Sequence, residues 1–425
     1  MGRAFINALK AQGALLDDEL VNDYLQNLGQ RLAINSPEQN REFSFFIINA
    51  NDINAFAGPN ATIGINKGLI LAAKNESQLA SVIAHEIAHV TQKHLTRAFQ
   101  ANNDTNLVTL ATVLAAILVS SSDPTASAAL MMGGVAGGMQ QQINFTRSNE
   151  NEADRVGLQI LSKSNLNPAG MVEFFEILQS STFFGSESDI EYLRTHPLNS
   201  TRIAEAASRT PKVSWSTPND SLLFQLARAR LAIANSDNPT ELQKNFLPEK
   251  NEKPAKTYAR ALLYMRLNKT GLAITTLEAL VKKHDHLWYE LSLAYAYLQN
   301  KNQIGALSIY KGLSDIYPGY LPVIHEYARA LIQFGKYGAC TQLLEKQLTE
   351  TYNSNTYKLL AQSYSGQKQL LNAYITNAKL YAHEGLYELA IQQINSALQL
   401  PDIKPEATAR LEATIEIYKK NYKIE

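Results

Sequence analysis

The sequence predicts a chain of two parts, a first part that mixes helices with strands and a second part built almost wholly from helices. A β-prone apolar run lies among helical patterns in the first part, at 43–49. The second part repeats alanines at a spacing of about 34 residues. Between them, SRTPKVSWSTPN loses all periodicity and gathers Pro, Ser and Thr. We therefore expect one domain at 1–210, a linker at 211–219 and a second domain at 220–425.

The elements of the first part can be read in order along the chain. Apolar residues recur at steps of three and four over about 17–34, which predicts an amphipathic helix. Residues 43–49, FSFFIIN, predict a strand, and the sequence GPN divides the extended segment 53–66. Asn75 or Ser77 can cap a long helix that follows. A further helix is expected over SNENEADRVGLQILSKS.

The second part carries a repeat. Its regularly spaced alanines are Ala273, Ala306, Ala339 and Ala373, and Ala261, Ala294 and Ala361 lie twelve residues before three of them. A small residue on each of two helices, with a period near 34, is typical of tetratricopeptide repeats, because small side chains let paired helices approach closely. An irregular helical bundle is the alternative. Stacked repeats form a concave surface suited to peptides or partner proteins. Residues 220–250 do not follow the alanine spacing, as expected of a degenerate or capping repeat.

Composition limits the function classes. Lys+Arg and Asp+Glu both number 39, so no net positive charge favours nucleic acid as a partner. The single cysteine, Cys340, cannot form an internal disulfide. The first residues lack an apolar leader, which fits either a cytoplasmic protein or a form whose leader was removed. Residues 105–122 and 124–146 carry no charge, so 105–146 is expected to cover the site, with peripheral membrane contact as the alternative.

The motif HEIAH lies in the middle of the long helix that Asn75 or Ser77 can cap. Residues four apart on a helix differ by about 40°, so His85 and His89 can point at one ion. Glu86 lies on the same side and can take a proton from water without binding the ion. This pattern is typical of a zinc hydrolase, although it also arises by chance, and a catalytic zinc usually needs a third protein ligand. His94, about 140° around the helix from His89, is expected to be solvated or structural.

The segment ENEAD offers the missing ligand. Glu150 and Asp154 are four residues apart and share one helix face. Glu150 could ligate the ion, and Asp154 could hold the outer nitrogen of a ligand histidine and fix its tautomer. Glu152 is about 200° from Glu150 and should face away. A solvated acidic start of a helix is the alternative for this segment taken alone.

HEIAH followed by ENEAD resembles the membrane-linked zinc metallopeptidases that include the CAAX prenyl protease and HtpX. INAFA, NESQLASVIAHEIAHVTQKHL, NENEADRVG, THPLNSTRIAEA and the repeats are most similar to the periplasmic, repeat-bearing branch of that family. The likeness is strong through 53–206 and mainly architectural afterwards. It implies an α+β zincin-like metallopeptidase domain followed by an all-α tetratricopeptide-repeat solenoid.

The resemblance also implies the roles of the residues. His85, His89 and Glu150 would bind one Zn²⁺ per chain, Glu86 would be the catalytic general base, and Asp154 would support the site during catalysis.

Three further features take their meaning from the same resemblance. His196, which reads as a turn histidine by itself, could approach the open position of the zinc as a regulatory fourth ligand and close the resting enzyme. Arg202 is a candidate for stabilising the oxyanion, with a solvated helix arginine as the alternative. Ala55, Phe56 and Ala57 could form an edge strand that pairs with extended substrate.

Together these features predict a zinc-dependent endopeptidase, with a chaperone-like role as a further expectation, in protein quality control of the bacterial envelope. The resemblance implies a periplasmic location, misfolded or stalled outer-membrane proteins as clients, and repeats that bind clients or the β-barrel assembly machinery. The alternative is a tetratricopeptide-repeat chaperone or scaffold with little or no proteolysis. The intact HEIAH favours the enzyme, because a scaffold has no chemical need of Glu86.

Overall fold

The computed structural model describes residues 2–94, 97, 147–182, 191–210, 221–248, 252–349, 352–401 and 403–422. The chain divides into two compact units, Met1–Asn235 and Ser236–Glu425. The expected linker at 211–219 lies outside the described residues. So does 105–146, which was expected to cover the site, with peripheral membrane contact as the alternative. The unit boundary falls later than the expected linker, because helix α13 (Leu222–Asn235) packs against α2 (Glu19–Ala33) and α3 (Lys67–Ala72) of the first unit.

The first unit contains a small mixed sheet. Its strands are β1 (Ser44–Ile48), β2 (Ala55–Ala57) and β3 (Thr62–Asn66), in the order β1-β3-β2. β1 is parallel to β3, and β2 runs antiparallel to β3 at the edge of the described sheet. Gly64 on β3 leaves room for the rings of Phe46 and Phe56, which a Cβ atom at Gly64 would meet at less than 3 Å. The strand expected at 43–49 is present as β1.

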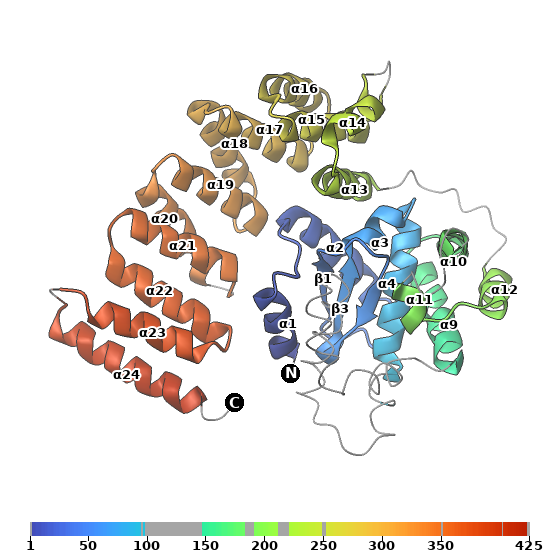
Figure 1. Cartoon of the computed structure of the whole chain (residues 1–425), viewed down its shortest axis with the longest axis horizontal. Coiled ribbons are helices and arrows are strands. Elements are labelled where there is room, and N and C mark those ends of the chain that lie inside the picture. The colour runs from blue at the N-terminus through green and yellow to red at the C-terminus, as the bar shows by residue number, and fades with distance from the viewer. Residues whose placement is uncertain are drawn as a thin grey trace. The chain divides into compact units, whose positions relative to one another are not determined.

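Helices form most of the remaining described part of the first unit. They are α1 (Gly2–Ala11), α2, η1 (Pro59–Ala61), α3, α4 (Glu76–Thr91), α9 (Arg147–Lys163), α10 (Ala169–Thr182), α11 (Glu191–Thr195), α12 (Ser200–Arg209) and α13. α4 is the central helix, and it packs against α2, α9, α10 and β2 (Figure 1). Asn75 caps α4, since its Oδ1 accepts a hydrogen bond from the backbone N–H of Gln78. The cap expected from sequence therefore sets where the HEIAH helix begins.

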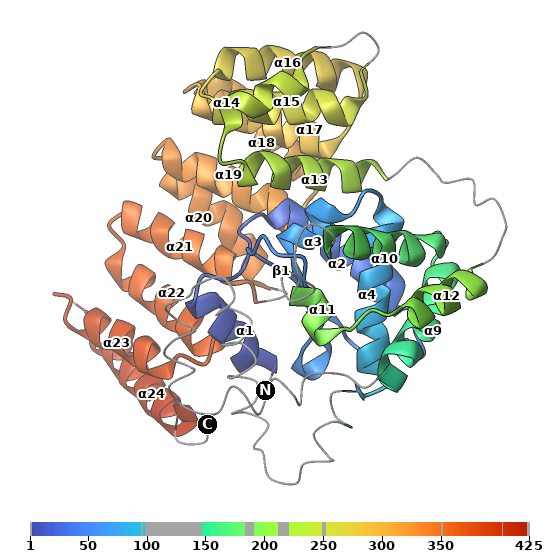
Figure 2. The ribbon, with the colours of Figure 1, turned by 45° about the vertical axis from the view of Figure 1, so that its right-hand side comes forward.

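Two glycines allow α9 and α10 to lie close to α4. A Cβ atom on Gly157 of α9 would lie 3.3 Å from the backbone nitrogen of His85. A Cβ atom on Gly170 of α10 would lie 2.6 Å from the backbone carbonyl of Ser77. The three helices lie side by side in both ribbon views (Figure 1 and Figure 2). This close packing brings the acidic residues of α9 against the histidines of α4.

The second unit is all helical in its described residues. Its elements are α14 (Pro239–Leu242), η3 (Gln243–Phe246), α15 (Pro254–Arg266), α16 (Thr270–Lys283), α17 (Leu287–Gln299), α18 (Gln303–Ile316), α19 (Leu321–Gln333), α20 (Tyr337–Glu345), η4 (Lys346–Thr349), α21 (Ser354–Gly366), α22 (Leu370–His383), α23 (Tyr387–Leu398) and α24 (Pro405–Tyr422). Consecutive helices pack against one another along the unit, from α15 with α16 to α23 with α24. In six of these pairs the turn contains a residue with positive φ, namely Asn268, Lys301, Gly319, Gly335, Lys368 or Gly385. The repeat architecture expected from sequence is confirmed.

One repeat corrects the expected register. Ala273, Ala306 and Ala373 are buried, but Ala339 is exposed and the neighbouring Cys340 occupies the buried small-residue position instead. Ala328, twelve residues earlier, is its buried partner, and the Cys340 thiol lies 3.7 Å from the Ala328 carbonyl oxygen. A cysteine is small enough for this position, so the repeat keeps its small buried side chain with a shift of one residue.

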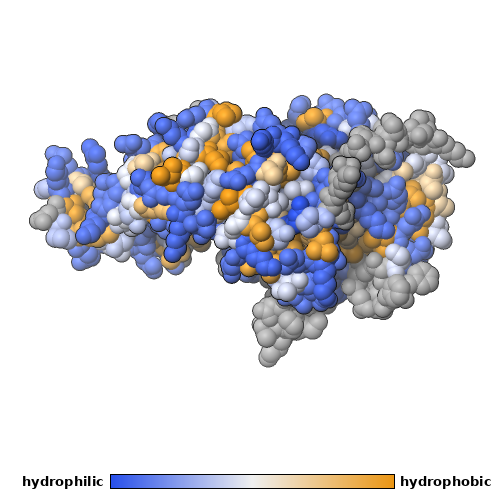
Figure 3. All heavy atoms as spheres, turned by 90° about the horizontal axis from the view of Figure 1, so that it is seen from above, coloured by the Kyte–Doolittle hydropathy of each residue, from blue (hydrophilic) through white to orange (hydrophobic). Residues whose placement is uncertain are grey.

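The face of the molecule seen from above in Figure 3 is mainly polar. Figure 3 shows hydrophilic side chains over most of one face, with apolar side chains scattered among them. Within the part of the chain that the structure describes, no helix is both long enough and apolar enough to cross a membrane.

Candidate metal centre

The two histidines of HEIAH lie one turn apart on α4 and face the same point. Both are buried, with exposed fractions of 2% for His85 and 1% for His89. Their Nε2 atoms are 2.9 Å apart. The four-residue helical spacing thus places two imidazole nitrogens together, as expected.

Helix α9 and the segment after α11 complete the cluster. The Glu150 carboxylate lies 3.4 Å from His85 Nε2 and 3.5 Å from His89 Nε2. His196 Nδ1 lies 3.2 Å from Glu150 Oε1 and 3.4 Å from His85 Nε2. One ligand atom from each of these four buried residues lies within 4.8 Å of the other three.

These residues fit a metal ion of the zinc type. Zinc bonds of 2.0–2.1 Å in tetrahedral geometry place neighbouring ligand atoms about 3.3 Å apart, close to the separations in this cluster. His85 Nδ1 lies 2.9 Å from Asp154 Oδ1, so the proton on Nδ1 is held there and Nε2 keeps a lone pair for the ion. Two imidazoles and a carboxylate form a donor set that suits zinc.

Glu86 is buried beside the cluster with no exposed surface. Neither of its carboxylate oxygens makes a hydrogen bond of normal geometry, and His196 Nε2 lies 3.6 Å from Oε1. A buried carboxylate without a hydrogen-bond partner destabilises the fold. Burial raises the pKa of Glu86, which increases its affinity for a proton.

The buried charges shift the pKa values of the cluster itself. Burial lowers the pKa of His85, but the Asp154 and Glu150 carboxylates outweigh it and raise the pKa to about 9. Burial and the neighbouring His85 hold the pKa of His89 well below its usual range. Burial alone would raise the pKa of Glu150, but the histidines around it, His196 first, hold the pKa well below normal. The cluster therefore favours negative carboxylates among imidazoles, the charge pattern that attracts a cation.

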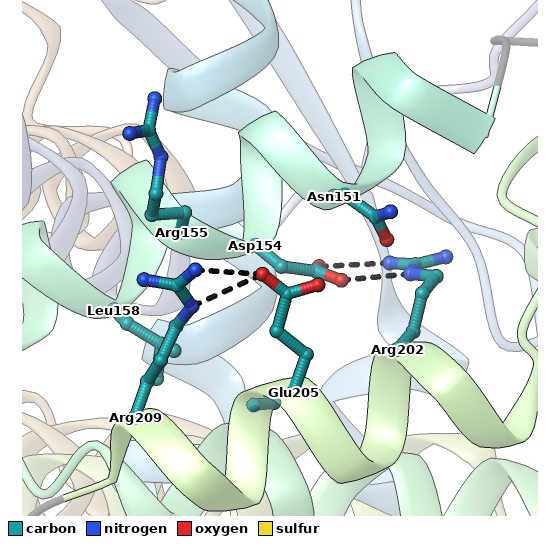
Figure 4. A pocket seen from close by; sticks show the side chains of 8 residues that line it. Asn151, Asp154, Arg155, Leu158, Arg202, Glu205 and Arg209 are labelled. Atoms are coloured by element: carbon teal, nitrogen blue, oxygen red, sulfur yellow. Dashed lines mark hydrogen bonds and ion pairs between the residues drawn. The ribbon is translucent and has the colours of Figure 1, made fainter.

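Arg202 of α12 is engaged with the acidic residues of α9. Its Nε and Nη2 atoms donate to the two oxygens of Asp154 at 2.7 and 2.8 Å. Its Nη1 lies 2.9 Å from Glu150 Oε2 and donates to the Pro197 carbonyl at 2.8 Å. Figure 4 shows Arg202 and Asp154 face to face at a small pocket, beside the pair of Glu205 and Arg209. The oxyanion role expected for Arg202 stays a prediction, and any such role would compete with these bonds.

The structure also places residues that sequence reasoning missed. His94 was expected to be solvated or structural, and it is not solvated, because it has no exposed surface and its Nδ1 lies 2.8 Å from His89 Nδ1. The helical angle did not apply, because α4 ends at Thr91 and Lys93 takes a positive φ of 55° that turns the chain back. Tyr192 of α11 is the second residue at the site that the sequence did not indicate. Its ring stacks on the ring of His196, with centroids 4.7 Å apart. No short sequence pattern marks either residue.

The expected substrate edge is also beside the cluster. β2, which holds Ala55, Phe56 and Ala57, pairs with β3 on one side and packs against α4. Burial raises the pKa of the Glu86 carboxyl, and the nearby backbone of Ala57 offsets a part of that rise. The candidate edge strand and the candidate base are therefore neighbours.

Comparison with known proteins agrees with this geometry. Residues 19–210 match the model of peptidase family M48. Over 98% of this chain and 86% of the relative, the sequence is 32% identical to the "Beta-barrel assembly-enhancing protease" of Escherichia coli K12. The chain belongs to peptidase family M48. It is therefore a metallopeptidase, and the resemblance stated from HEIAH and ENEAD is confirmed.

Other similarities of this M48 peptidase are more partial. It is 27% identical to "Metalloendopeptidase OMA1, mitochondrial" of Bos taurus, over 49% of this chain and 42% of that protein. It is 30% identical to "Metalloprotease LoiP" of Escherichia coli K12, over 30% of this chain and 48% of that protein. A tetratricopeptide repeat protein from Parabacteroides merdae aligns with 64% of this chain and 99% of its own, at 13% identity and a TM-score of 0.30. The repeat assignment rests instead on the helix pairs described above.

Proposed function

We propose that this M48 peptidase is a zinc-dependent endopeptidase of envelope quality control, which hydrolyses misfolded or stalled outer-membrane proteins in the periplasm. The observation that carries the proposal is the buried cluster of His85, His89 and Glu150 with the fully buried carboxylate of Glu86 beside it. The link to β-barrel assembly is carried over from the printed name of the relative that matches nearly the whole chain, and the client class and the location are carried over from the family resemblance of the sequence.

The residues of this chain divide the chemistry among them. A zinc ion held by His85, His89 and Glu150 would polarise the substrate carbonyl and lower the pKa of water. Glu86 is placed to take the proton from the attacking water and to return it to the leaving amine. Its raised pKa suits that exchange, because a base with a pKa nearer neutrality also serves as an acid. Asp154 holds His85 in the tautomer that leaves Nε2 free.

The edge strand β2 supplies a way to hold the substrate. An extended peptide can add to an exposed strand edge through backbone hydrogen bonds, which select for unfolded chain more than for sequence. Residues 55–57 would present such an edge next to Glu86. A peptidase built this way cuts chains that have failed to fold and spares compact ones.

His196 is proposed as a regulatory fourth ligand. Its Nδ1 lies among the three other donors, and its ring is fixed between Tyr192 and the cluster. A histidine in this place occupies the position that water needs, so the resting enzyme would be closed until the segment between α11 and α12 moves. The repeats of the second unit are proposed to bind clients or the β-barrel assembly machinery, because stacked helix pairs offer an extended binding surface.

Degradation of casein, an unfolded protein, tests the proposal. Zinc-loaded wild type, Glu86→Gln and His196→Ala are compared side by side, with bound zinc measured in each. We expect cleavage by wild type or by His196→Ala, faster in the latter, and none by Glu86→Gln although it keeps zinc. Cleavage by Glu86→Gln would remove Glu86 from the mechanism. Absence of cleavage in all three despite bound zinc would favour a chaperone or scaffold without proteolysis.

A further inference from the structure

We propose that His94 is a positioning residue for His89, and that it fixes the tautomer of His89 by accepting a hydrogen bond from it and passing a hydrogen bond on to Glu152. The proposal rests on the metal centre proposed above. It gives a role to three residues, His94, Glu152 and Arg97, that were not expected at the site.

The assignment follows from counting protons on the imidazole rings. A neutral imidazole has one N–H donor and one acceptor nitrogen. If His89 Nε2 gives its lone pair to a metal, the ring proton of His89 is on Nδ1. That Nδ1 lies 2.8 Å from His94 Nδ1, which must then be the acceptor. The proton of His94 is consequently on Nε2.

The surroundings of the other ring nitrogen of His94, Nε2, agree with a proton on that atom. His94 Nε2 lies 3.1 Å from Glu152 Oε2, a carboxylate oxygen that can only accept. The same oxygen accepts a hydrogen bond from Arg97 Nη2 at 3.0 Å. Every contact in the series from Arg97 through Glu152 and His94 to His89 thus has one donor and one acceptor.

The two ligand histidines of α4 are then supported in parallel ways. His85 reaches a carboxylate directly, since Asp154 holds its Nδ1 and Arg202 holds Asp154. Glu152 is on another side of α9 from Asp154, and the ring of His94 spans the remaining distance to His89. The positive φ of Lys93 turns the chain so that His94 can do this.

Two substitutions separate a hydrogen-bonding role from a space-filling role. In His94→Asn, the side-chain oxygen can take the place of Nδ1 and accept from His89, but volume is lost. In His94→Phe, the ring volume is kept and the acceptor is lost. Glu205→Ala is the matched control, because it removes a Glu–Arg pair of the same unit that touches no candidate ligand.

The measurement is zinc affinity of the full chain by competition with a chromogenic chelator. Loss of the partner of a ligand histidine typically weakens metal affinity by about 10- to 100-fold. We expect that loss for His94→Phe, an affinity near wild type for His94→Asn, and no change for Glu205→Ala. Wild-type affinity in His94→Phe, or weaker binding by His94→Asn than by His94→Phe, would overturn the positioning role. Absence of zinc binding by wild type would overturn the metal centre itself, a different result.

A second measurement needs no variant. Long-range ¹H–¹⁵N spectra of the zinc-loaded wild type, labelled at its eight histidines, report which ring nitrogen carries the proton. We expect the Nδ1–H tautomer for His89 and the Nε2–H tautomer for His94. A proton on Nδ1 of His94 would show that His94 does not accept from His89, and the proposal would be wrong.

Discussion

Replacing Arg202 with methionine tests whether one buried cation holds the acidic side of the site together. Arg202 is 2% exposed, and its guanidinium binds Asp154 through two nitrogens and Glu150 through the third. Methionine fills similar space but leaves two buried carboxylates without their cation. Removal of one partner from a buried ion pair costs about 3–5 kcal/mol.

The structure supports a value within that range. The three contacts to carboxylate oxygens are short, between 2.7 and 2.9 Å, and hydrogen bonds to charged groups contribute about 1.5–3 kcal/mol each without being additive. For a unit of this size, 1 kcal/mol lowers the melting temperature by about 2–4 °C. We therefore expect the melting temperature of the first unit to fall by roughly 6–20 °C in Arg202→Met.

The assay is differential scanning calorimetry of the full chain in the presence of a chelator. Arg209→Met is the matched control, because Arg209 is on the same helix and pairs with Glu205, but both side chains are largely exposed at 47% and 37%. A surface pair of this kind contributes about 0–1 kcal/mol. If Arg202→Met lowered the melting temperature no more than Arg209→Met, the reasoning about the buried network would be refuted.

Three further predictions concern other parts of the molecule. Glu150→Ala should bind zinc far more weakly than wild type in the same chelator competition, since it removes the carboxylate donor; unchanged affinity would exclude Glu150 as a ligand. Gly170→Ala should lower the free energy of unfolding by about 1–3 kcal/mol because its Cβ would clash with α4, whereas Gly312→Ala in α18, which meets nothing within 4 Å, should raise it by about 0.5–1 kcal/mol. Burial raises the pKa of the Cys340 thiol to about 11, so the folded state holds this proton more tightly than the unfolded state. That contribution to stability is present below about pH 8.5 and is lost as the pH rises towards 11. Iodoacetamide should therefore label Cys340 at pH 8 only after unfolding, and rapid labelling of the native protein would contradict its burial.

Sequence alone predicted the parts of the site that follow from local geometry. Helical spacing placed His85 beside His89 and Glu150 on the face of Asp154, and the contacts of these four side chains agree with that placement. Such predictions succeed because a regular helix fixes the directions of side chains three and four residues apart.

The remaining parts of the site depend on where a helix stops and on which elements meet. His94 does not follow the helical spacing of α4, because the positive φ of Lys93 turns the chain before it. Arg202 contacts its carboxylates because α12 packs against α9, which is distant in sequence. Likewise α13 looked like the first element of the repeats, but Arg230 on it pairs with Asp18 in the first unit. Backbone breaks and contacts distant in sequence leave no periodic pattern, so sequence reasoning could not find them.

The carboxylates collected between α4 and α9 have a consequence for how long each molecule survives. Glu86 and Glu150 are both almost fully buried in the core on which the first unit depends, and a bound cation would offset their repulsion. A ligand that binds only the folded state stabilises it by about 2.7 kcal/mol at a hundredfold excess over its dissociation constant. A chain deprived of metal would therefore unfold more often and be cleared sooner by the proteases that remove unfolded chains. Metal scarcity would then reduce the amount of this peptidase as well as its activity, and its abundance would follow the metal supply of its compartment.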